Sequence, residues 1–260
     1  MSLRNDWFIR PNRLAAAPTR LFCFPHAGVG TSAFRNWASA LGPDIEVCLV
    51  QLPGREGRHG QPLSSSIAEL ISPLVENMAS LLDRPFTFYG HSMGGTIAFE
   101  AALHVRKNYG LQPLHLFAAA SPAPQLPWAH SLLRMLPEDE FLHEIQARYG
   151  GLPAQMISDA ELRAIFLPIL RADIAMVETY ACTEAPPLDC GITVFGGLED
   201  TMVTRSSLQA WRRQTVSSFR LRMIAGDHLF LRSASAQLLE SIASELKAVC
   251  EKRATVGQNL

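Results

Sequence analysis

The sequence lacks a charge excess of either sign, a long apolar run and any paired cysteine motif. Its 260 residues include 23 basic and 24 acidic side chains, so no strong field favours nucleic acid or an anionic membrane as a partner. No apolar run reaches the length that crosses a bilayer, and residues 1–20 have no stretch typical of a signal peptide. We therefore expect a cytoplasmic protein that binds neither nucleic acid nor membrane.

Cysteine is scarce and scattered. The five cysteines form no C-x-x-C pair and no cluster with histidine at metal-binding spacing. An odd number of widely spaced thiols is typical of free cysteines in a reducing compartment. We expect neither a metal nor another cofactor, and we expect residues 1–260 to form one α/β domain.

The segment 90–95, which reads Gly-His-Ser-Met-Gly-Gly, contains the pattern G-x-S-x-G. It follows an apolar β-type run at 86–89 and precedes a helical pattern at 96–102. Glycines on both sides of a serine let a strand and a helix pass close together while the serine is held in a strained turn with its hydroxyl exposed. The pattern predicts a nucleophile at Ser92.

Short apolar runs alternate with amphipathic segments along most of the chain. The predicted strands are 21–24, 47–51, 86–89, 114–119, 192–197 and 219–224, and the predicted helices include 32–41, 67–82, 204–214 and 236–249. Continuous apolar strands that alternate with helices favour a mostly parallel central sheet with helices on both faces. The predicted fold class is α/β.

This alternation stops between about residues 122 and 187. An acidic first turn at 137–140 begins a helix that we expect to end at Gly150, and the capping-box pattern at 158–161 begins another, which Pro168 kinks or divides. So long a helical stretch in the middle of a sheet predicts an inserted lid over the strand ends. Ordinary crossover helices are the alternative.

Two further candidates for catalysis lie at the ends of the last two predicted strands. They are Asp200 and His228, and the chain order Ser, Asp, His is that of the α/β-hydrolases. A serine hydroxyl needs a base such as imidazole, and the imidazole needs a carboxylate that fixes its tautomer. We therefore predict an α/β-hydrolase fold in which Ser92, His228 and Asp200 form a catalytic triad.

Several neighbouring residues compete for these roles. Glu199 and Asp227 are alternative carboxylates, but Asp227 is too close in sequence to His228 to lie easily behind its ring. His26 stands among proline and glycine, so we interpret its loop as one that shapes the backbone. His91 lies inside the serine turn, where we expect it to be packed.

Acyl transfer also needs donors for the developing oxyanion. We predict the backbone N–H of Met93, the residue after the nucleophile, and that of Ala27, in the loop after the early strand. Met135, Met156 and Met176 either line an acyl pocket or pack the core of the lid.

A set of motifs is spread over nearly the whole chain. They are Phe-Pro-His-Ala-Gly at 24–28, Leu-Pro-Gly-Arg at 52–55, the serine motif at 88–95, Gly-Gly-Leu-Glu-Asp at 196–200, Trp211, and Gly-Asp-His-Leu-Phe-Leu at 226–231. Together they resemble the stand-alone type II thioesterases that accompany nonribosomal peptide and polyketide synthases. Val29 and Asp227 depart from the family pattern, and neither departure removes a catalytic group.

The resemblance implies hydrolysis of acyl groups, as misprimed or stalled units, from the phosphopantetheine arm of carrier proteins. Acyl or peptidyl carrier domains would be the partners and an acyl thioester the substrate. Carrier proteins are commonly acidic, which offers a role to arginines otherwise interpreted as solvated: Arg55, Arg58, Arg205, Arg212 and Arg213. We expect a monomer. A carboxylesterase or lipase, an acyltransferase and an idle carrier-binding module stay open as alternatives.

Overall fold

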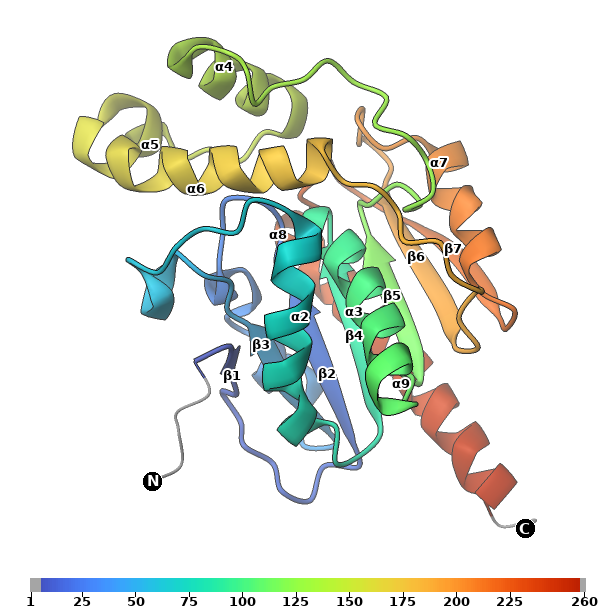
Figure 1. Ribbon diagram of the computed structural model, residues 1–260. Helices are drawn as coiled ribbons and strands as arrows, with labels where there is room; N and C mark the ends of the chain where they lie inside the picture. Colours follow the sequence, from blue (N-terminus) through green and yellow to red (C-terminus); the bar gives the residue numbers. More distant parts are fainter. Residues whose placement is uncertain (1–5, 258–260) are drawn as a thin grey trace.

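The computed structural model describes residues 6–257, so the start of the stretch tested above for a signal peptide lies outside the described residues. In this part of the chain seven strands form a sheet in the order β1-β3-β2-β4-β5-β6-β7. Strand β1 pairs antiparallel with β3, and the other neighbours pair in parallel. The predicted mostly parallel sheet is confirmed (Figure 1).

The strands follow the apolar runs closely. Their bounds are β1 Phe8–Ile9, β2 Thr19–Phe24, β3 Ile45–Val50, β4 Phe86–His91, β5 His115–Ala119, β6 Gly191–Gly197 and β7 Phe219–Ile224. Every residue of β2 to β6 is buried, because a parallel strand covered on both faces has no side in water. Strand β1 was not predicted, since two residues carry no periodicity.

Helices cover both faces of the sheet. Their bounds are α1 Trp37–Leu41, α2 Ile67–Met78, α3 Met93–Tyr109, α4 Glu138–Tyr149, α5 Ala154–Ser158, α6 Ala160–Glu178, α7 Arg205–Gln209, α8 Phe230–Ser233 and α9 Ser235–Gly257. Alternate residues of β2 serve the two faces. Phe22 and Phe24 pack with the α2 and α3 side, whereas Leu21 and Cys23 pack with the α1 and α9 side.

Some helix boundaries differ from the prediction. The predicted helices 32–41, 67–82 and 204–214 each include a short 3₁₀ segment, namely Thr31–Phe34, Ala79–Leu81 and Ala210–Gln214. Asp159, rather than Ser158, caps α6, and its side chain accepts the amides of Glu161 and Leu162. Pro168 lies inside α6 without dividing it.

Helices α4, α5 and α6 stand between β5 and β6 in the sequence and form what we call the α4–α6 segment. Figure 1 shows them across the end of the sheet toward which the parallel strands point. Residues of α4 and α6 form a small core with Leu133 of the preceding loop, made of Leu133, Phe141, Leu142, Ile145, Leu170 and Ile174. The segment therefore covers the carboxyl ends of the parallel strands (Figure 1).

Candidate active site

The turn between β4 and α3 carries Ser92 in a backbone conformation that is uncommon for a residue with a side chain. Its φ is 53° and its ψ is −118°. A Cβ on Gly90 would lie 2.0 Å from the carbonyl oxygen of Gly94, and a Cβ on Gly94 would lie 2.1 Å from that of Phe24. Glycine is required at both positions because the backbones approach so closely. The glycines thus let the turn present the serine at the tip of the strand.

The structure brings together the predicted serine, histidine and aspartate, each from the end of a different strand. Ser92 Oγ lies 2.9 Å from His228 Nε2, and His228 Nδ1 lies 2.9 Å from Asp200 Oδ2. The other carboxylate oxygen, Oδ1, accepts the amides of Met202 and Val203 at 2.9 and 3.1 Å. The three side chains form one continuous hydrogen-bonded chain.

The electrostatics of this chain favour an ionised Asp200. Burial by itself would raise the pKa of this carboxyl group, but the hydrogen bond and charge of His228 and the amides of Met202 and Val203 outweigh it, and the pKa is lowered. An ionised carboxylate accepts the proton on His228 Nδ1, which leaves the lone pair of Nε2 facing Ser92. The arrangement suits His228 to remove a proton from the serine.

The competing carboxylates are placed elsewhere. Glu199 is exposed, and the exposed Asp227 accepts the amide of Leu229 at 2.8 Å. The Nδ1 of the His228 ring is engaged by Asp200 instead. The geometry therefore agrees with the choice made from the sequence.

The two predicted oxyanion donors lie on the same cavity as Ser92. Met93 begins α3, where the first amides of a helix have no acceptor within the helix. Ala27 lies in the loop after β2, and both residues line the cavity with His228. Both predicted donors thus border the same cavity as Ser92 and His228, and their role stays a prediction.

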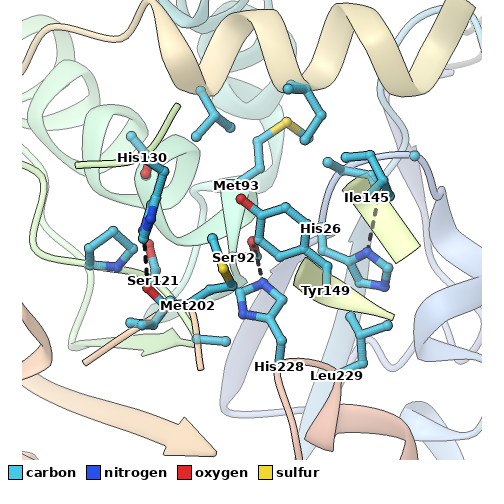
Figure 2. A pocket seen from close by; sticks show the side chains of 18 of the residues that line it. His26, Ser92, Met93, Ser121, His130, Ile145, Tyr149, Met202, His228 and Leu229 are labelled. Carbon is cyan, nitrogen blue, oxygen red and sulfur yellow. Dashed lines mark hydrogen bonds between the residues drawn. The ribbon is translucent and has the colours of Figure 1, made fainter. Parts of the chain in front are cut away.

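The cavity has a volume of about 430 Å³ and lies between the strand ends and the α4–α6 segment. Figure 2 shows Ser92 and His228 among the side chains that line it. Most of its wall is apolar, with contributions from Pro122, Trp128, Ile145, Met156, Phe166 and Ile174. Among the three methionines considered for an acyl pocket, Met156 lines this cavity, Met176 is in the core beneath α6, and Met135 is 76% exposed.

His91 is packed, as predicted, and it also supports the site. It is completely buried, and burial holds its pKa well below the usual value, so the ring is neutral. Its Nε2 lies 2.8 Å from the carbonyl oxygen of His228, and its Nδ1 lies 3.2 Å from the hydroxyl of Tyr89. The neutral ring donates to that carbonyl and fixes the backbone that carries His228.

His26 is likewise neutral but faces the cavity. Burial lowers its pKa to about 3, and its Nδ1 donates to the carbonyl oxygen of Ala27 at 3.0 Å. This bond to its own loop agrees with the interpretation of His26 as part of a loop that shapes the backbone, and the hydroxyl of Ser92 bonds to His228 instead.

The sequence did not indicate the role of Tyr149, the last residue of α4. Its ring centroid lies 5.0 Å from that of His228, and Figure 2 shows the ring beside Ser92 and His228. Burial raises the pKa of Tyr149 to about 12, so the hydroxyl is protonated at neutral pH. No local pattern identifies such a residue, because the contact depends on how the α4–α6 segment lies on the sheet.

Two arginines were interpreted wrongly. Arg55 and Arg58 are only 5% and 6% exposed, because Arg55 pairs with the buried carboxylate of Asp173 and Arg58 lies over the ring of Trp7. Their place in or beside the Leu-Pro-Gly-Arg motif was the available signal. The remaining arginines of that group, Arg205, Arg212 and Arg213, are exposed as expected.

The structure describes residues 6–257. Within that part of the chain, no group of three or more His, Cys, Asp and Glu side chains is arranged to hold a metal ion. No helix described for residues 6–257 combines the length and apolar character needed to span a membrane.

The sheet, the strained serine turn and the chain of Ser92, His228 and Asp200 define an enzyme of the α/β-hydrolase class. A family model described as a thioesterase domain matches residues 19–249. The gramicidin S biosynthesis protein GrsT of Aneurinibacillus migulanus is 40% identical over 245 residues, which cover 94% of this chain and 95% of GrsT. The chain therefore belongs to the thioesterase domain family.

Solved structures agree with this assignment. RedJ, a thioesterase from the prodiginine pathway of Streptomyces coelicolor, superposes with a TM-score of 0.85 at 34% identity, covering 91% of this chain and 94% of RedJ. YbtT, a type II thioesterase from the yersiniabactin NRPS/PKS pathway, gives 0.83 at 28% identity, covering 94% and 99%. The predicted resemblance to type II thioesterases and the predicted fold are confirmed.

Proposed function

We propose that this thioesterase hydrolyses acyl groups held as thioesters on the phosphopantetheine arm of carrier proteins in a nonribosomal peptide or polyketide assembly line. The observation that carries the chemistry is the hydrogen-bonded chain of Ser92, His228 and Asp200 at the base of a largely apolar cavity. The pathways named for GrsT and YbtT support the carrier-bound substrate. Clearance of misprimed or stalled units is the corresponding role.

In the first half-reaction, Ser92 Oγ attacks the thioester carbonyl carbon while His228 Nε2 takes the hydroxyl proton. The carbonyl oxygen becomes an oxyanion that accepts the backbone N–H groups of Met93 and Ala27. The carbon–sulfur bond then breaks, and the departing sulfur takes the proton from the imidazolium. A thiol with a pKa of about 8.5 leaves far more easily than an alcohol or amine, so this step needs little assistance.

In the second half-reaction, water replaces the thiol. His228 removes a proton from the water as the water oxygen attacks the ester carbon of the acyl-serine. The proton then passes from His228 to Ser92 Oγ when the acid departs. Asp200 stabilises the imidazolium in both halves and stays ionised because its pKa is lowered. The cycle ends with a free acid and an unchanged enzyme.

The α4–α6 segment acts in this proposal as the lid. The apolar cavity beneath it takes the acyl group, while the carrier domain stays outside and its arm reaches Ser92. Exposed Arg205, Arg212 and Arg213 are candidates for contact with an acidic carrier. Cytoplasmic localisation and a monomeric state stay predictions.

The test uses a carrier protein loaded with an acetyl group on its phosphopantetheine arm, measured by intact-mass spectrometry. The wild type and Ser92→Ala are compared, and an acetyl thioester of free pantetheine is run in parallel. We expect only the wild type to deacylate the carrier, faster than the free thioester. If Ser92→Ala keeps its activity, the proposed nucleophile is wrong. If free thioesters or simple esters are cleaved but the carrier stays loaded, the carrier partner is wrong.

A further inference from the structure

The lid helix α6 carries a carboxylate that reaches the loop proposed to hold the oxyanion. The side chain of Asp173 is completely buried, and that of Arg55 is 6% exposed. Arg55 Nη1 lies 2.5 Å from Asp173 Oδ2, and Nη2 lies 2.8 Å from Oδ1. The same Oδ2 accepts the amide of Gly28 at 2.8 Å. One carboxylate thus joins α6 to the loops that follow β2 and β3.

A buried ion pair by itself is weak evidence for stability, because removing two charges from water costs about as much as their attraction returns. What distinguishes this pair is the set of backbone groups that it holds. Arg55 Nη1 also donates to the carbonyl oxygen of Val29 at 3.3 Å. Both members of the pair therefore bind the backbone of the residues that immediately follow Ala27.

The peptide group between Ala27 and Gly28 is held at both ends. Its carbonyl oxygen accepts His26 Nδ1 at 3.0 Å, and its N–H donates to Asp173 Oδ2 at 2.8 Å. A trans peptide is planar, so two bonds on opposite sides fix the rotation of the whole group. The N–H of Ala27 lies in the preceding peptide group, which is joined to this plane through the Ala27 Cα, so holding the plane restricts the directions that this N–H can take.

The contact between Gly28 and α6 is close as well as polar. Gly28 has a φ of 78°, and a Cβ there would lie 2.8 Å from Leu170 Cδ1. The left-handed backbone favours glycine here, and a Cβ would also require the end of the Leu170 side chain to move. Helix α6 and the loop after β2 fit as one packed unit.

We propose that Asp173, oriented by Arg55, is a positioning residue for the oxyanion hole, so that the lid helix and the Ala27 donor are set in place together. The inference rests on the proposed function, in which the Ala27 amide binds the oxyanion. Asp173 itself touches no reacting atom. Its contribution is to hold the Ala27–Gly28 peptide in the orientation that the tetrahedral intermediate requires.

The test compares Asp173→Asn with Glu178→Gln. Glu178 is a matched control because it is another completely buried carboxylate of α6, but it binds the backbone of Leu133 and the side chain of Arg134 within the lid. A trifluoromethyl ketone that forms a tetrahedral adduct on Ser92 reports the oxyanion hole, and the product acid reports ground-state binding. We expect Asp173→Asn to lower kcat and ketone affinity by a similar factor of about 10 to 100, with KM and acid affinity changed less than about threefold.

A second variant separates positioning from folding. Arg55→Met combined with Asp173→Leu removes both charges, so no unpaired charge stays buried, yet Gly28 loses its acceptor. We expect this double variant to melt near the temperature of the wild type and to lose as much ketone affinity as Asp173→Asn. Arg55→Lys keeps a positive charge beside Asp173, so we expect its ketone affinity to lie between those of the double variant and the wild type.

Unchanged ketone affinity in the folded double variant, or an equal loss in Glu178→Gln, overturns the proposal. A wild type that forms no ketone adduct, or one whose adduct survives Ser92→Ala, instead overturns the proposed function.

Discussion

Replacement of Asp200 by asparagine tests whether the carboxylate sets the tautomer of His228. The two loop amides of Met202 and Val203 both point at Oδ1, so an asparagine retains both bonds only with its oxygen on that side. Its NH₂ group then faces His228 Nδ1, where it can only donate. The imidazole must accept at Nδ1 and carry its proton on Nε2, which is the wrong tautomer to deprotonate Ser92.

We therefore expect Asp200→Asn to fold normally and to lose about 10⁴-fold in kcat. Four decades in rate correspond to about 5.4 kcal/mol of transition-state stabilisation. The loss belongs to the tautomer and to the missing charge, because the hydrogen bonds to the loop are retained. If Asp200→Asn instead lost the hydrogen bonds from the amides of Met202 and Val203, its melting temperature would fall.

The assay is release of thiol from an acetyl-pantetheine thioester, with circular dichroism as the check on folding. Nitrogen chemical shifts of the His228 ring report directly which nitrogen carries the proton. Asp227→Asn is the matched control, since Asp227 is the exposed carboxylate beside the histidine, and we expect its activity to stay within about threefold of the wild type. A loss below about tenfold in a folded Asp200→Asn, or Nε2 left unprotonated, would refute the reasoning.

Further predictions concern the lid, the buried histidines and the serine turn. Tyr149→Phe should keep the ring over His228 and most of the activity, whereas Tyr149→Ala should admit water and lower kcat by about tenfold, measured with the same thiol-release assay. Burial lowers the pKa of His115 to about 4, so between pH 6.5 and 4 the unfolded chain binds a proton that the folded one does not, and the free energy of unfolding falls as pH falls. Urea titrations should show that His115→Gln reduces this slope by up to about 1.36 kcal/mol per pH unit, while His143→Gln, at an exposed residue, leaves it unchanged. Gly94→Ala should lower the free energy of unfolding, measured in urea, by more than about 3 kcal/mol, because the new Cβ would clash with backbone atoms that cannot move aside. Gly110→Ala is the control and should lower it by about 1 kcal/mol, because its Cβ would have no atom within 4 Å.

Local pattern explains which parts of the fold were predictable. Strands β2 to β6 were found because each contains a short apolar run whose burial on both faces leaves a strong composition signal. Strand β7 is only partly buried, and it was found from the apolar residues that alternate with Arg220 and Arg222. Helix α6 was found from its capping pattern, although Asp159 rather than Ser158 is the cap. The 3₁₀ segments were not found, because the choice between the two helix types depends on a few hydrogen bonds at the ends.

Site residues, too, were predictable where their signal is local in the sequence and not where it depends on a distant partner. The serine turn was predictable because the glycines that its close backbone contacts require stand within two residues of Ser92 in the sequence, although the contact of Gly94 is with the distant Phe24. The order of the three polar strand ends follows from one topology. Arg55 was misinterpreted because its partner, Asp173, is 118 residues distant, and an isolated arginine in a sequence looks like any solvated charge. A charged side chain is stable in a protein interior only where it is paired with an opposite charge. The burial of Arg55 is therefore a property of the contact between α6 and the loop after β3, and the Leu-Pro-Gly-Arg motif at 52–55 marks the arginine without indicating its partner.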